Sequence, residues 1–172
     1  VTARAQEAKP EFTTAEAKRT LPKEQISTFT TYLSSGGPRV DNIKLAARQL
    51  DGAYVAPGET FSLNQLLGPR TPDKGYQKAG VISGGRLTND YGGGISQLST
   101  TLFNAVFFSG AKIEEFHPHS FYISRYPEAR EATVPRPEQS PDDRAGERHA
   151  RGARAVNISL DDTHAWCVFR RL

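Results

Sequence analysis

Three consecutive glycines followed by a hydroxyl-rich helix start form the part of this sequence best suited to chemistry. The glycines at 92–94 precede Ser96, and the apolar spacing beyond them predicts a helix over residues 95–109. Glycine lets the backbone turn sharply and lets another group approach closely. A helix N-terminus presents unpaired N–H groups with a partial positive charge. Gly93 and Gly94 could therefore help to hold a carboxylate or a developing oxyanion, with Ser96 as a nucleophile.

A simpler interpretation of the same residues stays open. Ser96 could be only the N-cap of the helix, and the glycines could be only a tight turn. A phosphate-binding loop is excluded, because the Gly-Lys-Ser or Gly-Lys-Thr ending of that motif is missing.

Two histidines supply a second chemical feature. His117 and His119 lie in a segment that we expect to be extended, where residues two apart point to the same face. They could provide a general base for Ser96 or two metal ligands. A metal needs at least one more ligand, which this spacing does not provide, so we expect neither a metal nor another cofactor. The alternative for His119 is a structural role.

Two further polar residues have candidate roles. Arg130 could bind a carboxylate through two hydrogen bonds, or it could form a structural or surface ion pair. Asn104 interrupts an apolar helical run, so we expect its side chain to hydrogen-bond a neighbouring loop.

The helices and strands that we expect to position these residues indicate an α+β fold. We expect a single domain with two main helices packed on a mostly antiparallel sheet. Thr13 and Glu16 predict a capping box before a short helix. The second long helix should be buried nearly all round. The expected elements are strand 26–33, helix 41–51, strand–turn–strand 54–64, strand pair 77–87, helix 95–109 and an extended segment over 112–125.

Composition excludes several classes of protein. The chain has 172 residues and a net charge of +3, with scattered basic residues and no nucleic-acid-binding motif. The single cysteine, Cys167, excludes a disulfide framework within the chain. No apolar run approaches the length of a membrane span. We therefore expect no nucleic-acid partner, and membrane anchoring only through a part upstream of Val1.

The domain organisation follows from changes in composition. Residues 1–24 are polar and are interpreted as a linker or the end of a preceding domain, and residues 25–134 as the folded domain. Residues 135–155 have no large apolar side chains, so we expect disorder there. Residues 156–172 are strand-like again. A one-base shift of a possible coding sequence for 146–150 reads Val-Asn-Asp-Thr-Pro, so the divergent segment is also interpreted as a candidate frameshift product.

A set of motifs, in order, resembles the VanW family from about residue 29 to residue 134. The form with Ser96 and with Ser120-Phe121-Tyr122-Ile123-Ser124-Arg125-Tyr126-Pro127 resembles the actinobacterial branch of that family. The motifs include Phe29-Thr30-Thr31-Tyr32, Pro57-Gly58-Glu59-Thr60-Phe61-Ser62, Gly68-Pro69-Arg70, Gly92-Gly93-Gly94-Ile95 with Gln97, Ser99-Thr100-Thr101-Leu102, His119-Ser120 and Arg130-Glu131-Ala132-Thr133-Val134.

The resemblance implies a function in the cell envelope, outside the membrane. VanW domains often follow a peptidoglycan-binding domain, and the family name comes from glycopeptide (vancomycin) resistance clusters. For some members the resemblance implies L,D-transpeptidase activity on peptidoglycan stem peptides. In the motif Gly-Gly-Gly-Ile-Cys-Gln the cysteine would be the nucleophile.

This sequence departs from that motif, because Ser96 stands at the cysteine position. A thiol ionises readily near a helix N-terminus, whereas a serine hydroxyl needs a positioned base. Ala129, where the family usually has glycine, is a smaller departure.

We therefore expect a domain that binds stem peptides without catalysis. One alternative is an acyl transferase of L,D-transpeptidase type using Ser96 and His119, and another is a metal-dependent hydrolase using His117 and His119. The expected substrate-binding residues are Gly93, Gly94, Gln97, Thr100, His117, Ser120 and Arg130.

Overall fold

The computed structural model describes residues 13–19, 24–34, 36–55, 59–83, 85–120 and 122–134, and the backbone of 154–160 and 164–171. Residues 135–153, which hold most of the segment predicted to be disordered, lie outside the described residues. The elements in chain order are α1 (Thr14–Arg19), β1 (Glu24–Tyr32), α2 (Pro38–Leu50), β2 (Tyr54–Val55), α3 (Leu63–Leu67), a 3₁₀ turn (Pro72–Lys74), β3 (Lys78–Ser83), β4 (Arg86–Tyr91), α4 (Ile95–Phe108), β5 (Arg154–Leu160) and β6 (His164–Arg171).

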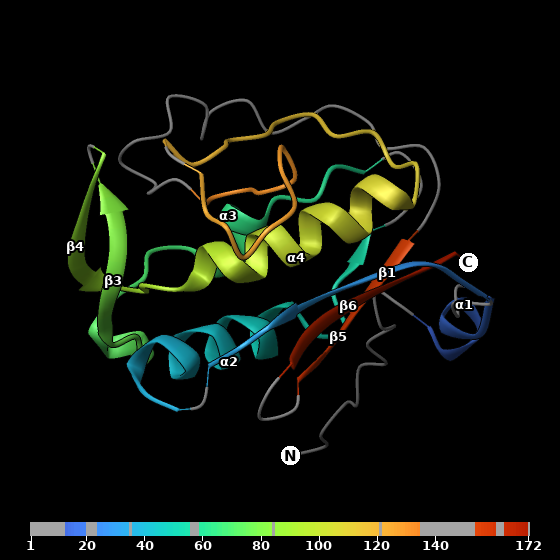
Figure 1. Cartoon of the computed structure of the whole chain (residues 1–172). Helices are drawn as coiled ribbons and strands as arrows, with labels where there is room; N and C mark the ends of the chain where they lie inside the picture. Colours follow the sequence, from blue (N-terminus) through green and yellow to red (C-terminus); the bar gives the residue numbers. More distant parts are fainter. Residues whose placement is uncertain are drawn as a thin grey trace, which may run out of the picture.

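Two antiparallel sheets accompany the helices (Figure 1). The larger sheet has the strand order β1-β6-β5-β2, and the smaller is the β3–β4 hairpin. The neighbouring strands of the larger sheet pair antiparallel, with β1 and β6 in register from Glu24 opposite Arg171 to Tyr32 opposite His164. The predicted α+β class, with two main helices and a mostly antiparallel sheet, is confirmed.

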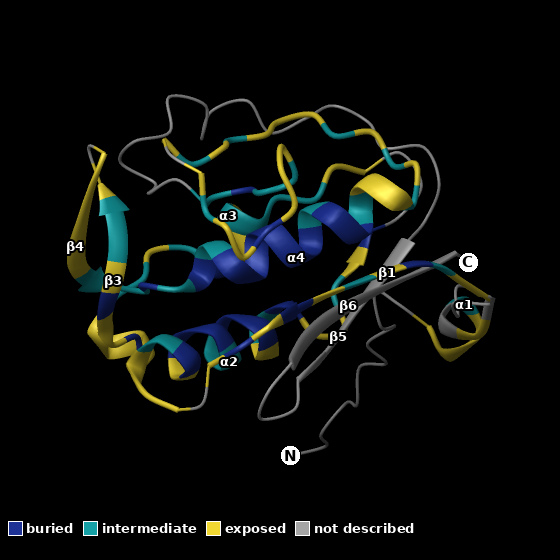
Figure 2. Ribbon diagram, viewed as in Figure 1, coloured by how far each residue is buried: buried dark blue, intermediate teal, exposed yellow. Residues whose placement is uncertain are grey.

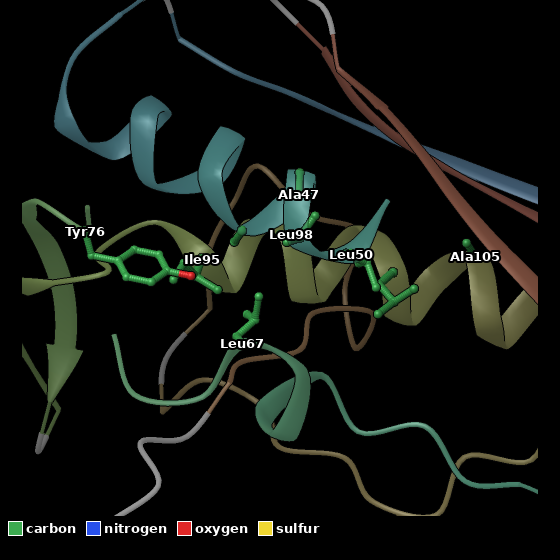
Figure 3. Close-up of a cluster of buried hydrophobic side chains, with 9 residues drawn as sticks. Ala47, Leu50, Leu67, Tyr76, Ile95, Leu98 and Ala105 are labelled. Carbon is green, nitrogen blue, oxygen red and sulfur yellow. The ribbon is translucent and has the colours of Figure 1, made fainter. Parts of the chain in front are cut away.

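The core lies between α2 and α4. Figure 3 shows Ala47 and Leu50 of α2 facing Leu98 and Ala105 of α4, and Leu67 of α3 closes the cluster. The spacing of these residues places them on one face of each helix. Most of α4 is therefore buried, and its axis is fixed by contacts on several sides (Figure 2).

Hydrogen bonds made by side chains of β1 attach α4 to that strand. The Ser27 hydroxyl donates to the carbonyl oxygen of Ala105 at 2.5 Å, and the hydroxyls of Thr31 and Thr101 lie 2.7 Å apart. All of these groups are buried, where a polar group needs a partner. These bonds set the position of α4 along the strand.

Two sequence-based expectations about local structure are wrong. Residues 59–64 alternate like a strand, but the Ser62 hydroxyl accepts a hydrogen bond from the Gln65 amide and caps α3. Phe107 and Phe108 are 53% and 51% exposed, so the last turn of α4 is not buried all round. The described residues of 112–125, which were expected to be extended, belong to neither a helix nor a strand. They belong to a segment that crosses over α4 (Figure 1).

No helix within the described residues is long and apolar enough to cross a membrane.

Candidate functional site

Helix α4 begins one residue before Ser96. Its N-cap is Gly94, with a φ of 103°, and Ile95 is the first helical residue. Ser96 therefore lies in the first turn, and the interpretation of Ser96 as the N-cap is wrong. The Ile95 amide donates to Gly92 and the Gln97 amide donates to Gly94, while the Ser96 amide has no partner among the described residues.

The glycines before α4 allow close contacts within the protein itself. A Cβ at Gly93 would lie 2.4 Å from the carbonyl carbon and oxygen of Ala79 on β3. A Cβ at Gly94 would lie 2.6 Å from Cγ of Arg39 on α2. The buried Asn42 side chain donates to the Gly93 carbonyl at 3.0 Å and fixes the turn. Substrate contact by Gly93 and Gly94 stays a prediction.

The hydroxyl of Ser96 is hydrogen-bonded to another hydroxyl. Its oxygen lies 3.0 Å from Oγ1 of Thr133, and either atom can donate. The amide of Thr133 donates to the carbonyl of His117 at 2.8 Å. Within the described part of the chain no hydrogen bond joins Ser96 to a histidine ring. The structure thus brings Ser96 to the segment that carries Thr133, and not into contact with its predicted base.

Thr100 and Asn104 hold that segment against α4. The Thr100 hydroxyl donates to the Ala132 carbonyl at 2.9 Å and accepts from the Ala132 amide at 3.0 Å. The Asn104 side-chain amide donates to the Arg130 carbonyl at 2.7 Å, which confirms the predicted contact with a neighbouring loop. Both residues are fully buried. They position the chain beside Ser96.

Gln97 is fully buried and links three elements. Its Nε2 donates to the Thr31 hydroxyl at 3.0 Å and to the Tyr32 carbonyl at 2.7 Å, both on β1. Its Oε1 accepts a hydrogen bond of 2.7 Å from Nη2 of Arg39 on α2. These contacts give Gln97 a positioning role, and its predicted contact with substrate is untested.

His119 lies beside a carboxylate. Its Nδ1 is 3.3 Å from Oε2 of Glu131, with side chains 5% and 12% exposed, but neither atom has a hydrogen-bond partner among the described residues. Burial lowers the pKa of His119 below its usual 6.5, although the Glu131 carboxylate raises it in part, and Arg125 lowers it further. The imidazole is therefore neutral at neutral pH, the state that a base requires.

His117 and Ser120 lie in different surroundings. His117 contacts the Glu115 carboxylate and its side chain is 43% exposed, whereas His119 is buried. Ser120 is exposed. Among the residues described, no group of three His, Cys, Asp or Glu side chains is arranged to hold a metal ion. The two histidine side chains contact different carboxylates, Glu115 and Glu131.

The side chain of Arg130 is directed toward the other end of α4. Its guanidinium carbon lies 5.4 Å from the centre of the Phe108 ring and 6.0 Å from that of Phe29. Phe108 is the last residue of α4, and a helical rise of about 1.5 Å per residue places it about 18 Å from Ser96. The structure therefore does not bring the Arg130 guanidinium to Ser96.

Sequence reasoning missed the charged and phenolic groups that do surround the helix start. Arg39 contacts Gly94 and Gln97, and Tyr126 is 4% exposed. Burial raises the pKa of Tyr126, partly offset by the charges of Arg125 and Arg39 and by a hydrogen bond with Thr100. Arg125 and Tyr126 lie within the motif at residues 120–127 that resembles the actinobacterial branch of the family. That motif was the signal in the sequence that could have identified them as candidate site residues.

Comparisons with known proteins agree with the motifs. A family model described as "VanW like protein" matches residues 38–146. The chain is 44% identical over 115 residues to "Uncharacterized protein YoaR" of Bacillus subtilis (strain 168), covering 66% of this chain and 38% of that protein. It is 42% identical over 65 residues to "Vancomycin B-type resistance protein VanW" of Enterococcus faecalis (strain ATCC 700802 / V583), covering 38% of this chain and 24% of that protein.

These alignments leave most of each relative outside the match. No solved structure matches the chain. The family model nevertheless covers more than half of the chain, including α2, the glycine turn, α4 and the segment that carries His119 and Thr133. The chain belongs to the VanW family.

Proposed function

We propose that this VanW domain binds peptidoglycan stem peptides at the N-terminal end of α4, in the cell envelope and without covalent chemistry. Three things support the proposal: the family membership, a relative named as a vancomycin B-type resistance protein, and the environment of Ser96. The extracytoplasmic location and the absence of a nucleic-acid partner are parts of the same proposal.

The observation that carries the non-catalytic assignment is the partner of Ser96. Its hydroxyl is hydrogen-bonded to the hydroxyl of Thr133, which is no base near neutral pH. A serine becomes a useful nucleophile only when a positioned base takes its proton. The hydroxyl is therefore arranged as a hydrogen-bonding group, suited to contact a peptide.

The test is a binding measurement on soluble stem tetrapeptide and on purified sacculi. Wild type and Ser96→Ala should bind both, with affinities within about threefold of each other, because only one hydrogen bond is lost. Intact-protein mass spectrometry after incubation should show no added mass. Absence of binding to both ligands would overturn the proposal.

One observation favours a second candidate, acyl transfer of the L,D-transpeptidase type. A carboxylate beside Nδ1 of His119 favours the proton on that nitrogen and leaves Nε2 free to act as a base. In this reaction Ser96 Oγ would attack a donor peptide carbonyl, His119 would take the serine proton and pass it to the departing amine, and an acceptor amine would then displace Ser96. An adduct or crosslinked product that disappears in Ser96→Ala would establish this function.

A further inference from the structure

The hairpin of β3 and β4 forms a sheet of its own. Its two strands pair with each other and with no other strand in the described part of the chain (Figure 1). Most residues of both strands are exposed or half-buried. A two-stranded sheet is only marginally stable by itself, and the outer edge of each strand offers unpaired N–H and C=O groups. The hairpin can therefore accept a third strand.

The hydrogen-bond register identifies the backbone groups on each edge. The Gly92 amide donates to the Gln77 carbonyl at 3.2 Å at the base of the hairpin. Hydrogen-bonded and non-hydrogen-bonded pairs alternate along an antiparallel ladder, so every second pair beyond this one directs its N–H and C=O groups away from the opposite strand. These pairs are Lys78 with Tyr91, Gly80 with Asn89, and Ile82 with Leu87.

The edge of β3 lies beside the proposed binding site. Gly93 is packed on the backbone of Ala79 in β3 so closely that a Cβ would be 2.4 Å from the Ala79 carbonyl. The three residues from Gly93 to Ser96 span at most about 11 Å. On the β4 edge, by contrast, the outward amide of Tyr91 already donates to the Asp90 carboxylate at 2.7 Å. The β3 edge is therefore better placed for a ligand that contacts Ser96.

The residues along the β3 edge suit an extended, acidic peptide. Gly80 is exposed, and a glycine inside a strand lets another backbone approach closely. Lys78 is exposed, lies 5.3 Å from the centre of the Tyr91 ring and has no carboxylate partner among the described residues. A cation there complements the carboxylates of a stem peptide. An extended tetrapeptide is about 13 Å long, enough to pair with Gly80 and to reach Ser96.

We propose that the stem peptide binds as a third strand on the outer edge of β3, with main-chain hydrogen bonds to Gly80 and Ile82 and one end at Ser96. In strand addition the main-chain hydrogen bonds provide much of the affinity. The inference rests on the proposed function, and it adds the conformation of the ligand and the second element that binds it.

Amide hydrogen exchange of the wild-type chain gives the first test. Saturating stem tetrapeptide should slow exchange of the Gly80 and Ile82 amides about tenfold or more, because both N–H groups become hydrogen-bonded. The Asn89 and Leu87 amides, which face outward on the opposite strand, are the internal control and should exchange equally fast with and without peptide. Peptide binding that leaves Gly80 and Ile82 unprotected would overturn the strand addition while the proposed function stands.

A matched pair of proline variants gives the second test. Proline is tolerated in an edge strand where the N–H faces solvent, so Gly80→Pro removes one outward donor without breaking the β3–β4 ladder. It should weaken binding of the tetrapeptide about tenfold. Asn89→Pro makes the same change on the β4 edge and should stay within about twofold of wild type. Equal affinities of the two variants would overturn the assignment of the β3 edge, and the exchange measurement decides if either variant does not fold.

Two further outcomes separate this inference from its alternatives. Protection of Gly80 and Ile82 that needs no peptide and rises with protein concentration would identify a second copy of the chain as the occupant and overturn the proposal. Binding to purified sacculi without binding of the soluble tetrapeptide would overturn the strand addition and leave the proposed function standing. If neither ligand binds, the proposed function fails and this inference fails with it.

Discussion

The hydroxyls of Ser96 and Thr133 lie 3.0 Å apart, and this contact links the start of α4 to the segment that carries both candidate histidines. The Thr133 amide is bonded to the His117 carbonyl, and Glu131, two residues earlier, lies beside His119. In a cysteine-bearing homologue the thiol at this position would meet the same helix N-terminus. The serine keeps the position, but its hydroxyl is bonded to another hydroxyl.

A Ser96→Cys variant should acquire a reactive thiol. The helix N-terminus stabilises a thiolate and lowers its pKa below the ordinary value of about 8.5. We expect alkylation by iodoacetamide at pH 7 to be about tenfold faster than for a free thiol. The rate is measured in a Cys167→Ser background, with the Cys167 thiol of the otherwise wild-type chain as the comparison. A rate equal to that of a free thiol would show that the site does not activate a nucleophile.

Gln97→Ala should destabilise the fold strongly. The change leaves Arg39, the Thr31 hydroxyl and the Tyr32 carbonyl without their buried partner. We expect the free energy of unfolding to fall by about 2 to 4 kcal/mol. Gln65→Ala, at an exposed position of α3, should change it by less than about 0.5 kcal/mol. Urea denaturation of both variants makes the comparison, and similar losses would disprove the positioning role.

Gly93→Ala should be among the most damaging single-methyl changes in the chain. The added carbon would lie 2.4 Å from the Ala79 backbone, which cannot move without displacing β3. A loss of about 3 kcal/mol or more is expected, by overpacking. Gly80→Ala is the matched control, because its added carbon would be 3.5 Å from a Leu87 methyl group, an ordinary contact. Thermal unfolding should separate the two variants clearly, and equal melting temperatures would contradict the account of the turn.

His119 should make the folded state sensitive to mild acid. Its pKa in the folded protein is lowered by burial, against the opposing charge of Glu131 and with that of Arg125. The unfolded chain therefore binds more protons below about pH 6.5. The free energy of unfolding should decrease as pH falls from about 6.5 toward the folded pKa, by at most about 1.4 kcal/mol per pH unit.

Urea titrations at several pH values measure this effect. His119→Gln should remove this part of the pH dependence, because no group then charges at the buried position. His117→Gln changes a side chain that is 43% exposed and should retain the wild-type profile. A wild-type stability that is flat between pH 7 and about pH 5 would rule out a neutral buried imidazole.

Local signals in the sequence predicted most of the secondary structure. Thr13 and Glu16 form the reciprocal bonds of a capping box, and apolar spacing predicted both long helices. The alternation of polar and apolar residues over 59–64 wrongly predicted a strand. Ser62 caps a helix instead, and this helix is favoured because α3 buries Leu67 in the core. Short segments depend on such tertiary contacts more than long periodic ones do.

The polar contacts of the site were much less predictable. Arg39 and Gln97 are 58 positions apart in the chain. A contact between residues so far apart produces no local periodicity in the sequence from which it could be predicted. Residue type suggested that Arg130 could bind a carboxylate, but it does not tell in which direction a long side chain points. The aromatic rings of Phe29 and Phe108 attract the Arg130 guanidinium, and this contact follows only from the packing of β1 against α4.

The most direct test of the account is an NMR titration of the ¹⁵N-labelled domain with a stem tetrapeptide, followed by intact-protein mass spectrometry of the same sample. Amide shifts should be concentrated at residues 94–97 and 131–133, at Arg39 and along β3, with no added mass on the protein. Shifts elsewhere, or none at saturating peptide, would contradict binding at the start of α4. A Ser96-dependent acyl adduct would show instead that the domain is an enzyme.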